Sequence, residues 1–204
     1  MTFNYFLTFL VLCCLFISSC ETENELNQSN SNASVETKNE PLNQKSPTPK
    51  FDADSAFEYI KKQVDFGPRV PNTKEHNLCG EWLEKKLVHY GFDVLLQKGK
   101  VTAFNGAKLN ITNIIGRYNT SSKERIMLCA HWDTRPFADR DSIKINLPIE
   151  GANDGASGVG VLLEIARNIS LSNPFIGVDI IFFDAEDYGA PSMSGQFFDL
   201  NSMN

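Results

Sequence analysis

The sequence has no run of basic residues, and its 25 acidic residues outnumber its 19 basic ones. A protein that binds a nucleic-acid backbone needs a basic surface, so we expect no nucleic-acid partner. The five cysteines form no disulfide framework, because Cys13, Cys14 and Cys20 lie near the N-terminus. Cys79 and Cys129 lack the spacing of a cysteine zinc site, and the apolar run around Cys129 predicts a buried thiol.

The first 19 residues lack lysine and arginine and are almost uniformly apolar, and Ile17-Ser18-Ser19 directly precedes Cys20. A short apolar segment that ends in small residues is typical of a signal peptide. Small residues before a cysteine resemble the bacterial lipobox, in which the cysteine is lipidated. We therefore expect residues 1–20 to direct export, with a lipid anchor at Cys20 that makes the protein a periplasmic or cell-surface lipoprotein. An ordinary cleaved signal or a short membrane anchor is the alternative.

Large apolar side chains are nearly absent from residues 21–50, which are rich in Asn, Ser, Glu, Thr and Pro. Such a segment cannot bury enough surface to offset its chain entropy, so we expect a disordered tether. The folded domain is expected over residues 51–204, which is long enough for one substantial core.

Periodic apolar residues predict helices over 54–65, 74–90 and 156–169. The first is expected to begin with Asp54 as N-cap and to have Phe57 on its apolar face. Short branched runs predict strands, and the last two are apolar enough to suggest a sheet covered on both faces. These predicted strands span 92–96, 111–118, 126–130 and 178–183. Their alternation with helices predicts an α/β domain.

Three candidate metal ligands lie in loops that follow or precede buried elements. His131 follows the strand 126–130, Asp154 lies in a glycine-rich turn, and Asp187 follows the strand 178–183. Ligands of α/β proteins gather beyond the carboxyl ends of the strands. Zinc accepts histidine nitrogen and carboxylate oxygen, and catalytic sites usually use three protein ligands. The three loops together predict a zinc site.

Two further carboxylates have expected roles beside these ligands. Asp133 lies two residues after His131, so an extended backbone would place both on one side. Asp133 could then accept the second imidazole N–H and fix the ligating tautomer. Glu186 adjoins Asp187 and points differently, which suits a general base that faces substrate.

Each motif also has a simpler explanation. The His131–Asp133 pair could be structural, Asp154 could cap the following helix, and Glu186-Asp187 could be a solvated loop. A phosphate loop is disfavoured, because the lysine of that motif is absent.

Three consecutive segments resemble the zinc glutaminyl cyclases and the related zinc aminopeptidases. They are HWDTRP at 131–136, GANDGASGVGVLLEIAR at 151–167 and IFFDAEDYG at 181–189. Upstream, Phe66-Gly67-Pro68-Arg69 and His76 resemble the N-terminal signature of the same family, so the resemblance covers residues 55–190. It implies a three-layer α/β/α sandwich around a mixed, twisted sheet.

The resemblance also implies roles. Asp154 would be the central zinc ligand, Asp187 a second ligand and Glu186 the general acid and base. His131 matches a second-metal ligand of two-zinc aminopeptidases, or a pocket-lining residue of one-zinc cyclases. The Glu186-Asp187 pair and the HWDTRP segment are closer to the cyclases.

The implied reaction converts the N-terminal glutamine of a peptide or protein to pyroglutamate, with release of ammonia. A zinc aminopeptidase and a non-catalytic surface lipoprotein are the alternatives. The family has a further histidine ligand downstream, whereas His76, His89 and His131 all precede Asp187 here. We therefore expect a domain shortened at its C-terminus with an incomplete metal site, and a monomer when the domain is complete.

Overall fold

The computed structural model describes residues 48–190. The predicted signal peptide, Cys20 and nearly all of the predicted tether lie outside these residues, so those expectations remain predictions. Within 48–190, no helix has the length and apolar character needed to cross a bilayer.

A four-stranded mixed sheet positions the candidate site. Strand β1 (Asp93–Thr102) pairs antiparallel with β2 (Lys108–Tyr118), and β2 pairs antiparallel with β4 (Gly177–Phe183). Strand β3 (Arg125–His131) pairs parallel with β4, so the strand order is β1-β2-β4-β3. In this register His131 lies opposite Phe183. The loops after β3 and β4 therefore leave the sheet side by side.

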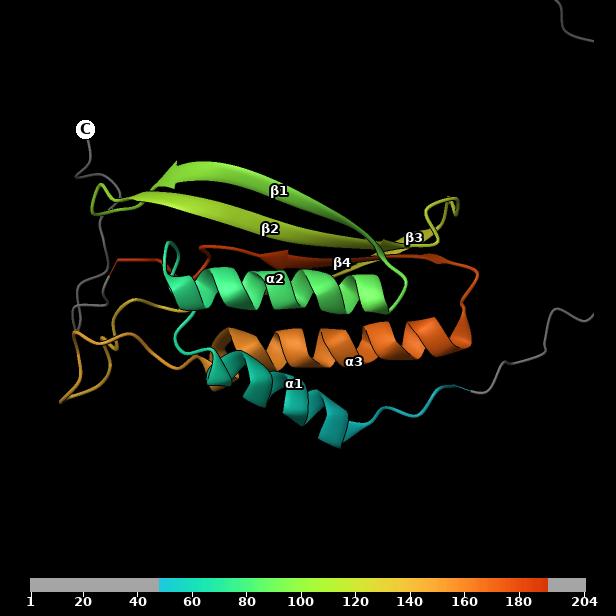
Figure 1. The fold of residues 1–204 in the computed structure, drawn as a ribbon, viewed down its shortest axis with the longest axis horizontal. Coiled ribbons are helices and arrows are strands. Elements are labelled where there is room, and N and C mark those ends of the chain that lie inside the picture. The colour runs from blue at the N-terminus through green and yellow to red at the C-terminus, as the bar shows by residue number, and fades with distance from the viewer. Residues whose placement is uncertain (1–47, 191–204) are drawn as a thin grey trace, which may run out of the picture. The chain divides into compact units, whose positions relative to one another are not determined.

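The described helices all lie on one side of the sheet, as Figure 1 shows. Helices α2 (Lys74–His89) and α3 (Ser157–Ser172) pack on the strands, and α1 (Ala53–Asp65) packs mainly on α3. The core between helices and sheet is built from fully buried apolar side chains, which include Leu83, Leu87, Ile114, Leu163, Ile180 and Phe182. The α/β class and the mixed sheet are confirmed.

The details of α1 differ from the prediction. Asp52, not Asp54, is the N-cap, and its carboxylate accepts the backbone N–H groups of Asp54 and Ser55. Phe57 is 63% exposed, while Ala56 and Gln63 are buried. The helix packs on α3 through the face that carries Ala56 and Ile60, so Phe57 is left on the outside.

The face of the sheet opposite the helices is open among the described residues. We call it the open face, and it carries Leu95, Ile115, Met127, Cys129, Ile181 and Phe183. Met127 is 63% exposed and Cys129 is also exposed, so the predictions of a doubly covered β3 and of a buried Cys129 are wrong for residues 48–190. The apolar character of β3 misled the prediction, because it does not reveal how many faces are covered.

Candidate functional site

The loops that carry the predicted site residues meet at the carboxyl ends of β3 and β4. The Nε2 atom of His131 lies 2.9 Å from Oδ1 of Asp154. Its Nδ1 atom lies 3.9 Å from Oε2 of Glu186. Asp154 and Asp187 line the same pocket, whose volume is about 510 Å³. The structure thus brings together all three loops that the sequence singled out.

A wide turn over Ala152–Ala156 directs Asp154 toward His131. Asp154 has extended backbone angles within this turn (φ −105°, ψ 103°), and its peptide bond to Gly155 is cis. Gly155 permits the close approach, since a Cβ at this position would lie 2.9 Å from Nδ1 of His131 and closer still to other atoms of that residue. Helix α3 has no side-chain N-cap, so the interpretation of Asp154 as a helix cap is wrong.

Asp133 connects the β3 loop to the β4 loop. Its buried carboxylate accepts the backbone N–H groups of Glu186 and Asp187, both at 3.1 Å. Its Oδ1 atom also lies 3.5 Å from Nδ1 of His131, on the side where the sequence placed it. Asp133 therefore orients two neighbouring loops, because backbone amides bound to a carboxylate form strong, charge-assisted hydrogen bonds.

The electrostatics of the site are dominated by clustered carboxylates. The neighbouring Asp133 carboxylate, followed by Asp154 and Glu186, raises the pKa of His131 to about 9. Burial, and then the negative charge of Asp154, raise the pKa of the Asp187 carboxyl. The buried Oδ2 atom of Asp187 has no hydrogen-bond partner in the described part of the chain. Such a cluster favours a bound cation, which would offset the repulsion between carboxylates.

Arg135 contributes to this site, although the sequence gave it no role. Its guanidinium forms two hydrogen bonds with the Asp139 carboxylate, and Nη1 lies 3.5 Å from Oδ1 of Asp187. It also donates to the carbonyls of Asp187 and Ala190. Arg135 therefore partly neutralises Asp187 and holds its backbone. In the sequence, only the position of Arg135 within the segment 131–136 could have indicated this role.

Arg69 also contributes to the candidate site, although sequence analysis assigned it no role. It is fully buried, and it donates to the carbonyls of Trp132 at 3.4 Å, Glu150 at 2.6 Å and Gly151 at 2.8 Å. It joins the β3 loop to the turn that carries Asp154. Only its position in the Phe66-Gly67-Pro68-Arg69 segment pointed to it.

The donor atoms fit zinc in type but do not form a complete site. Asp154 and Asp187 offer carboxylate oxygens on one pocket, and the unpartnered Oδ2 of Asp187 is suited to a metal. Within residues 48–190, however, no group of three or more His, Cys, Asp or Glu side chains is spaced to hold a metal ion. A complete coordination sphere needs at least one further ligand.

Known proteins share the segments that carry these site residues. Residues 113–195 match peptidase family M28. The glutaminyl cyclase of Bacteroides thetaiotaomicron bound to N-acetylhistamine superposes with a TM-score of 0.71 and is 56% identical, over 74% of this chain and 52% of that one. The predicted resemblance to the glutaminyl cyclases is confirmed. A Zn-dependent exopeptidase from Parabacteroides distasonis is also similar, with 49% identity and a TM-score of 0.71 over 76% of this chain.

The match to these relatives is partial in length. The chain spans 53% of the Parabacteroides distasonis protein, so about half of the solved relatives is matched. The bovine glutaminyl-peptide cyclotransferase is 32% identical over 88 residues, which is 38% of this chain and 23% of that protein. The residues that match the family, 113–195, include His131, Asp154 and Glu186-Asp187.

Proposed function

We propose that this protein acts as a zinc-dependent glutaminyl-peptide cyclotransferase. Its substrates would be peptides or proteins with an N-terminal glutamine, which it converts to pyroglutamate with release of ammonia. The observation that carries this proposal is the meeting of Asp154, Glu186 and Asp187 around His131 at one sheet edge. The identity of 56% to a solved glutaminyl cyclase supports the same reaction.

Asp154 and Asp187 would hold the zinc ion, with a further ligand from outside the described residues. Bound there, zinc would supply Lewis-acid polarisation of the glutamine side-chain carbonyl. Arg135 would keep Asp187 in place and limit the repulsion between the two carboxylates, since its guanidinium already contacts Asp187.

Glu186 would move the proton in this reaction. Its side chain is 64% exposed, while its backbone N–H is held by Asp133, so the carboxylate is free to face a substrate from a fixed backbone. It would accept a proton from the attacking α-amine and deliver it to the departing ammonia. Closing a five-membered ring requires a folded substrate, so positioning would supply much of the acceleration.

The test is ammonia release from a peptide with N-terminal glutamine, measured with zinc-supplemented protein. Glu186→Gln should lower the rate by about 10²-fold or more, because it removes the proton carrier. Glu58→Gln is the matched control, since Glu58 is an exposed residue of α1, and it should leave the rate unchanged. Hydrolysis of the first peptide bond without ammonia release would contradict the cyclase proposal.

A zinc aminopeptidase is the second candidate. The contact of 2.9 Å between His131 and Asp154 favours it, because this imidazole and carboxylate lie close enough to hold a second metal ion. Metal counting by mass spectrometry separates the two: two zinc ions per chain favour the peptidase, and one favours the cyclase. If the protein neither cyclised the N-terminal glutamine nor hydrolysed the first peptide bond, the non-catalytic alternative would be favoured.

We further propose that the protein is exported and lipid-anchored through Cys20. The apolar segment and the small residues before Cys20 support this. Cys20→Ser should abolish incorporation of labelled palmitate and release the protein from the membrane fraction, whereas Cys14→Ser should change neither. Equal labelling of both variants would contradict lipidation at Cys20.

A further inference from the structure

His76 and Asp184 form a buried pair close to the site but outside its pocket. Nε2 of His76 lies 2.8 Å from Oδ1 of Asp184, and the two side chains are 4% and 0% exposed. The other ring nitrogen of His76 has no hydrogen-bond partner among residues 48–190. Within this part of the chain, Asp184 is therefore the one group that the ring binds through a hydrogen bond.

Asp184 fixes the start of the β4 loop to the neighbouring strand. Its Oδ2 atom accepts the backbone N–H of Thr112 at 2.6 Å, and its own N–H donates to Oδ1 of Asn113 at 2.9 Å. Glu186 and Asp187 follow two and three residues later. A shift of Asp184 would thus be transmitted directly to both.

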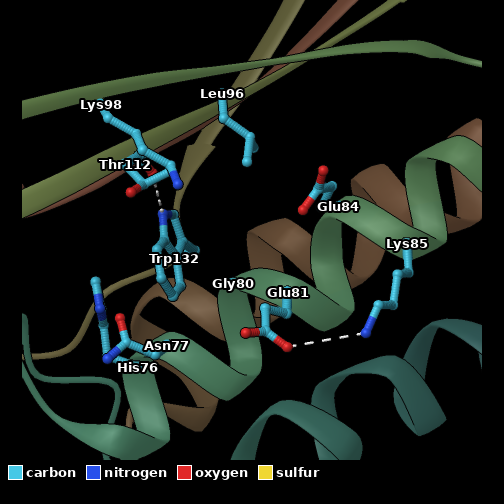
Figure 2. Close-up of a pocket in the computed structure, with 10 residues that line it drawn as sticks. All are labelled: His76, Asn77, Gly80, Glu81, Glu84, Lys85, Leu96, Lys98, Thr112 and Trp132. Atoms are coloured by element: carbon cyan, nitrogen blue, oxygen red, sulfur yellow. Dashed lines mark hydrogen bonds and ion pairs between the residues drawn. The ribbon is translucent and has the colours of Figure 1, made fainter.

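His76 also supports the β3 loop through Trp132. The two rings stack with centroids 4.2 Å apart and an interplanar angle of 19°. Trp132 Nε1 donates to the Thr112 carbonyl at 3.2 Å. Figure 2 shows His76 and Trp132 together at one end of a pocket of about 620 Å³ between α2 and strands β1 and β2. One side chain of α2 therefore contacts both loops of the site.

We propose that His76 and Asp184 are a positioning pair, which sets the loop of Glu186 and Asp187 against the loop of His131 and Asp133 without contacting substrate. Removing the imidazole would leave the buried Asp184 carboxylate with one donor fewer, which is costly in a site shielded from water. The carboxylate would move to find water, and the β4 loop would move with it. The effect of this pair on catalysis rests on the proposed function, whereas its effect on the position of the β4 loop does not.

The test measures amide hydrogen exchange by NMR in His76→Phe, His76→Gln and Asp184→Asn. Phe keeps the ring stacking and removes the hydrogen bond, so the amides of Glu186 and Asp187 should exchange about tenfold faster. Gln places an N–H near the position of Nε2 and should restore most of the protection. Asp184→Asn removes the charge with little change in volume and should also accelerate both amides. His89→Phe is the matched control, because His89 is exposed on the same helix.

The amides of Ile180 and Phe182 within β4 provide the internal reference. Faster exchange confined to Glu186 and Asp187 supports positioning. Unchanged exchange at these two residues overturns the proposal, and so does an equal acceleration at Ile180 and Phe182, since that would show a general loss of stability. The exchange measurement needs neither zinc nor substrate. It therefore tests the positioning pair even if the protein fails to release ammonia in the cyclase assay.

Discussion

At the residue scale, Gly155 leaves no room for a side chain beside the candidate site. A Cβ there would lie 2.5 Å from the backbone oxygen of His131 and 2.8 Å from its Cε1 atom. Gly155→Ala should therefore displace His131 and lower the free energy of unfolding by about 1–3 kcal/mol, as overpacking does. Urea denaturation measures this. Gly99→Ala is the control, since its nearest neighbour would be at 3.5 Å and its stability should change by less than about 0.5 kcal/mol.

The titration of His131 is a second test at this scale. In metal-free protein its imidazole should titrate near pH 9, because Asp133 and Asp154 favour the charged form. The folded pKa exceeds the unfolded value of 6.5, so the stabilisation is fully present below pH 6.5 and is lost as pH rises through about 9. NMR titration of the ring proton measures this. Asp133→Asn should lower the midpoint, and an unchanged midpoint would contradict the assigned cause.

At the scale of secondary-structure elements, the apolar patterns predicted the three α-helices and the four strands of residues 48–190, because burial against one face imposes a period. They did not predict the full length of β1, which continues to Thr102 beyond the predicted 92–96, or the helical turn over Ala152–Ala156. Burial of individual residues was harder to predict. Phe57 has the helical spacing of a core residue, but the face of α1 that packs on α3 carries Ala56 and Ile60, and Phe57 lies outside it. The choice between Asp52 and Asp54 as N-cap also depended on the path of the chain before α1, which the sequence pattern does not specify.

The close packing of α1 on α3 depends on Gly160. A Cβ at Gly160 would lie 2.7 Å from Cγ1 of Ile60 and 2.9 Å from the carbonyl oxygen of Ala56. Gly160→Ala should force the helices apart and destabilise the protein by about 1–3 kcal/mol, despite the better helix propensity of alanine. Val161→Ala is the control, because Val161 is 41% exposed on the same helix. Chemical denaturation with circular dichroism compares them, and a stabilised Gly160→Ala would refute this packing argument.

At the scale of the whole molecule, the sequence predicted which loops meet at the candidate site but not the contacts that hold these loops together. His131, Asp154 and Asp187 were identified because polar residues after buried strands are conspicuous and their loops share a sheet edge. Arg69 and His76 were not assigned roles, since their partners are distant in sequence: Gly151 is 82 residues from Arg69, and Asp184 is 108 from His76. Such contacts are specified by the tertiary fold and leave no local pattern.

The two described cysteines should differ in reactivity, because they lie on opposite sides of the sheet. Burial raises the pKa of the Cys79 thiol to about 12, whereas Cys129 is exposed on the open face. Brief treatment with iodoacetamide should modify Cys129 and spare Cys79, since the thiolate is the reactive form. Peptide mapping by mass spectrometry measures both sites. Equal modification in the folded protein would contradict the burial of Cys79.

The open face also has a consequence for handling the protein in solution. Met127 and Phe183 present an exposed apolar surface beside the unpaired edge of β3 within residues 48–190. Such surfaces adhere to one another and to amphiphiles. Light scattering per molecule should rise with protein concentration, and a mild detergent should lower it. Met127→Lys should lower it in the same way without detergent.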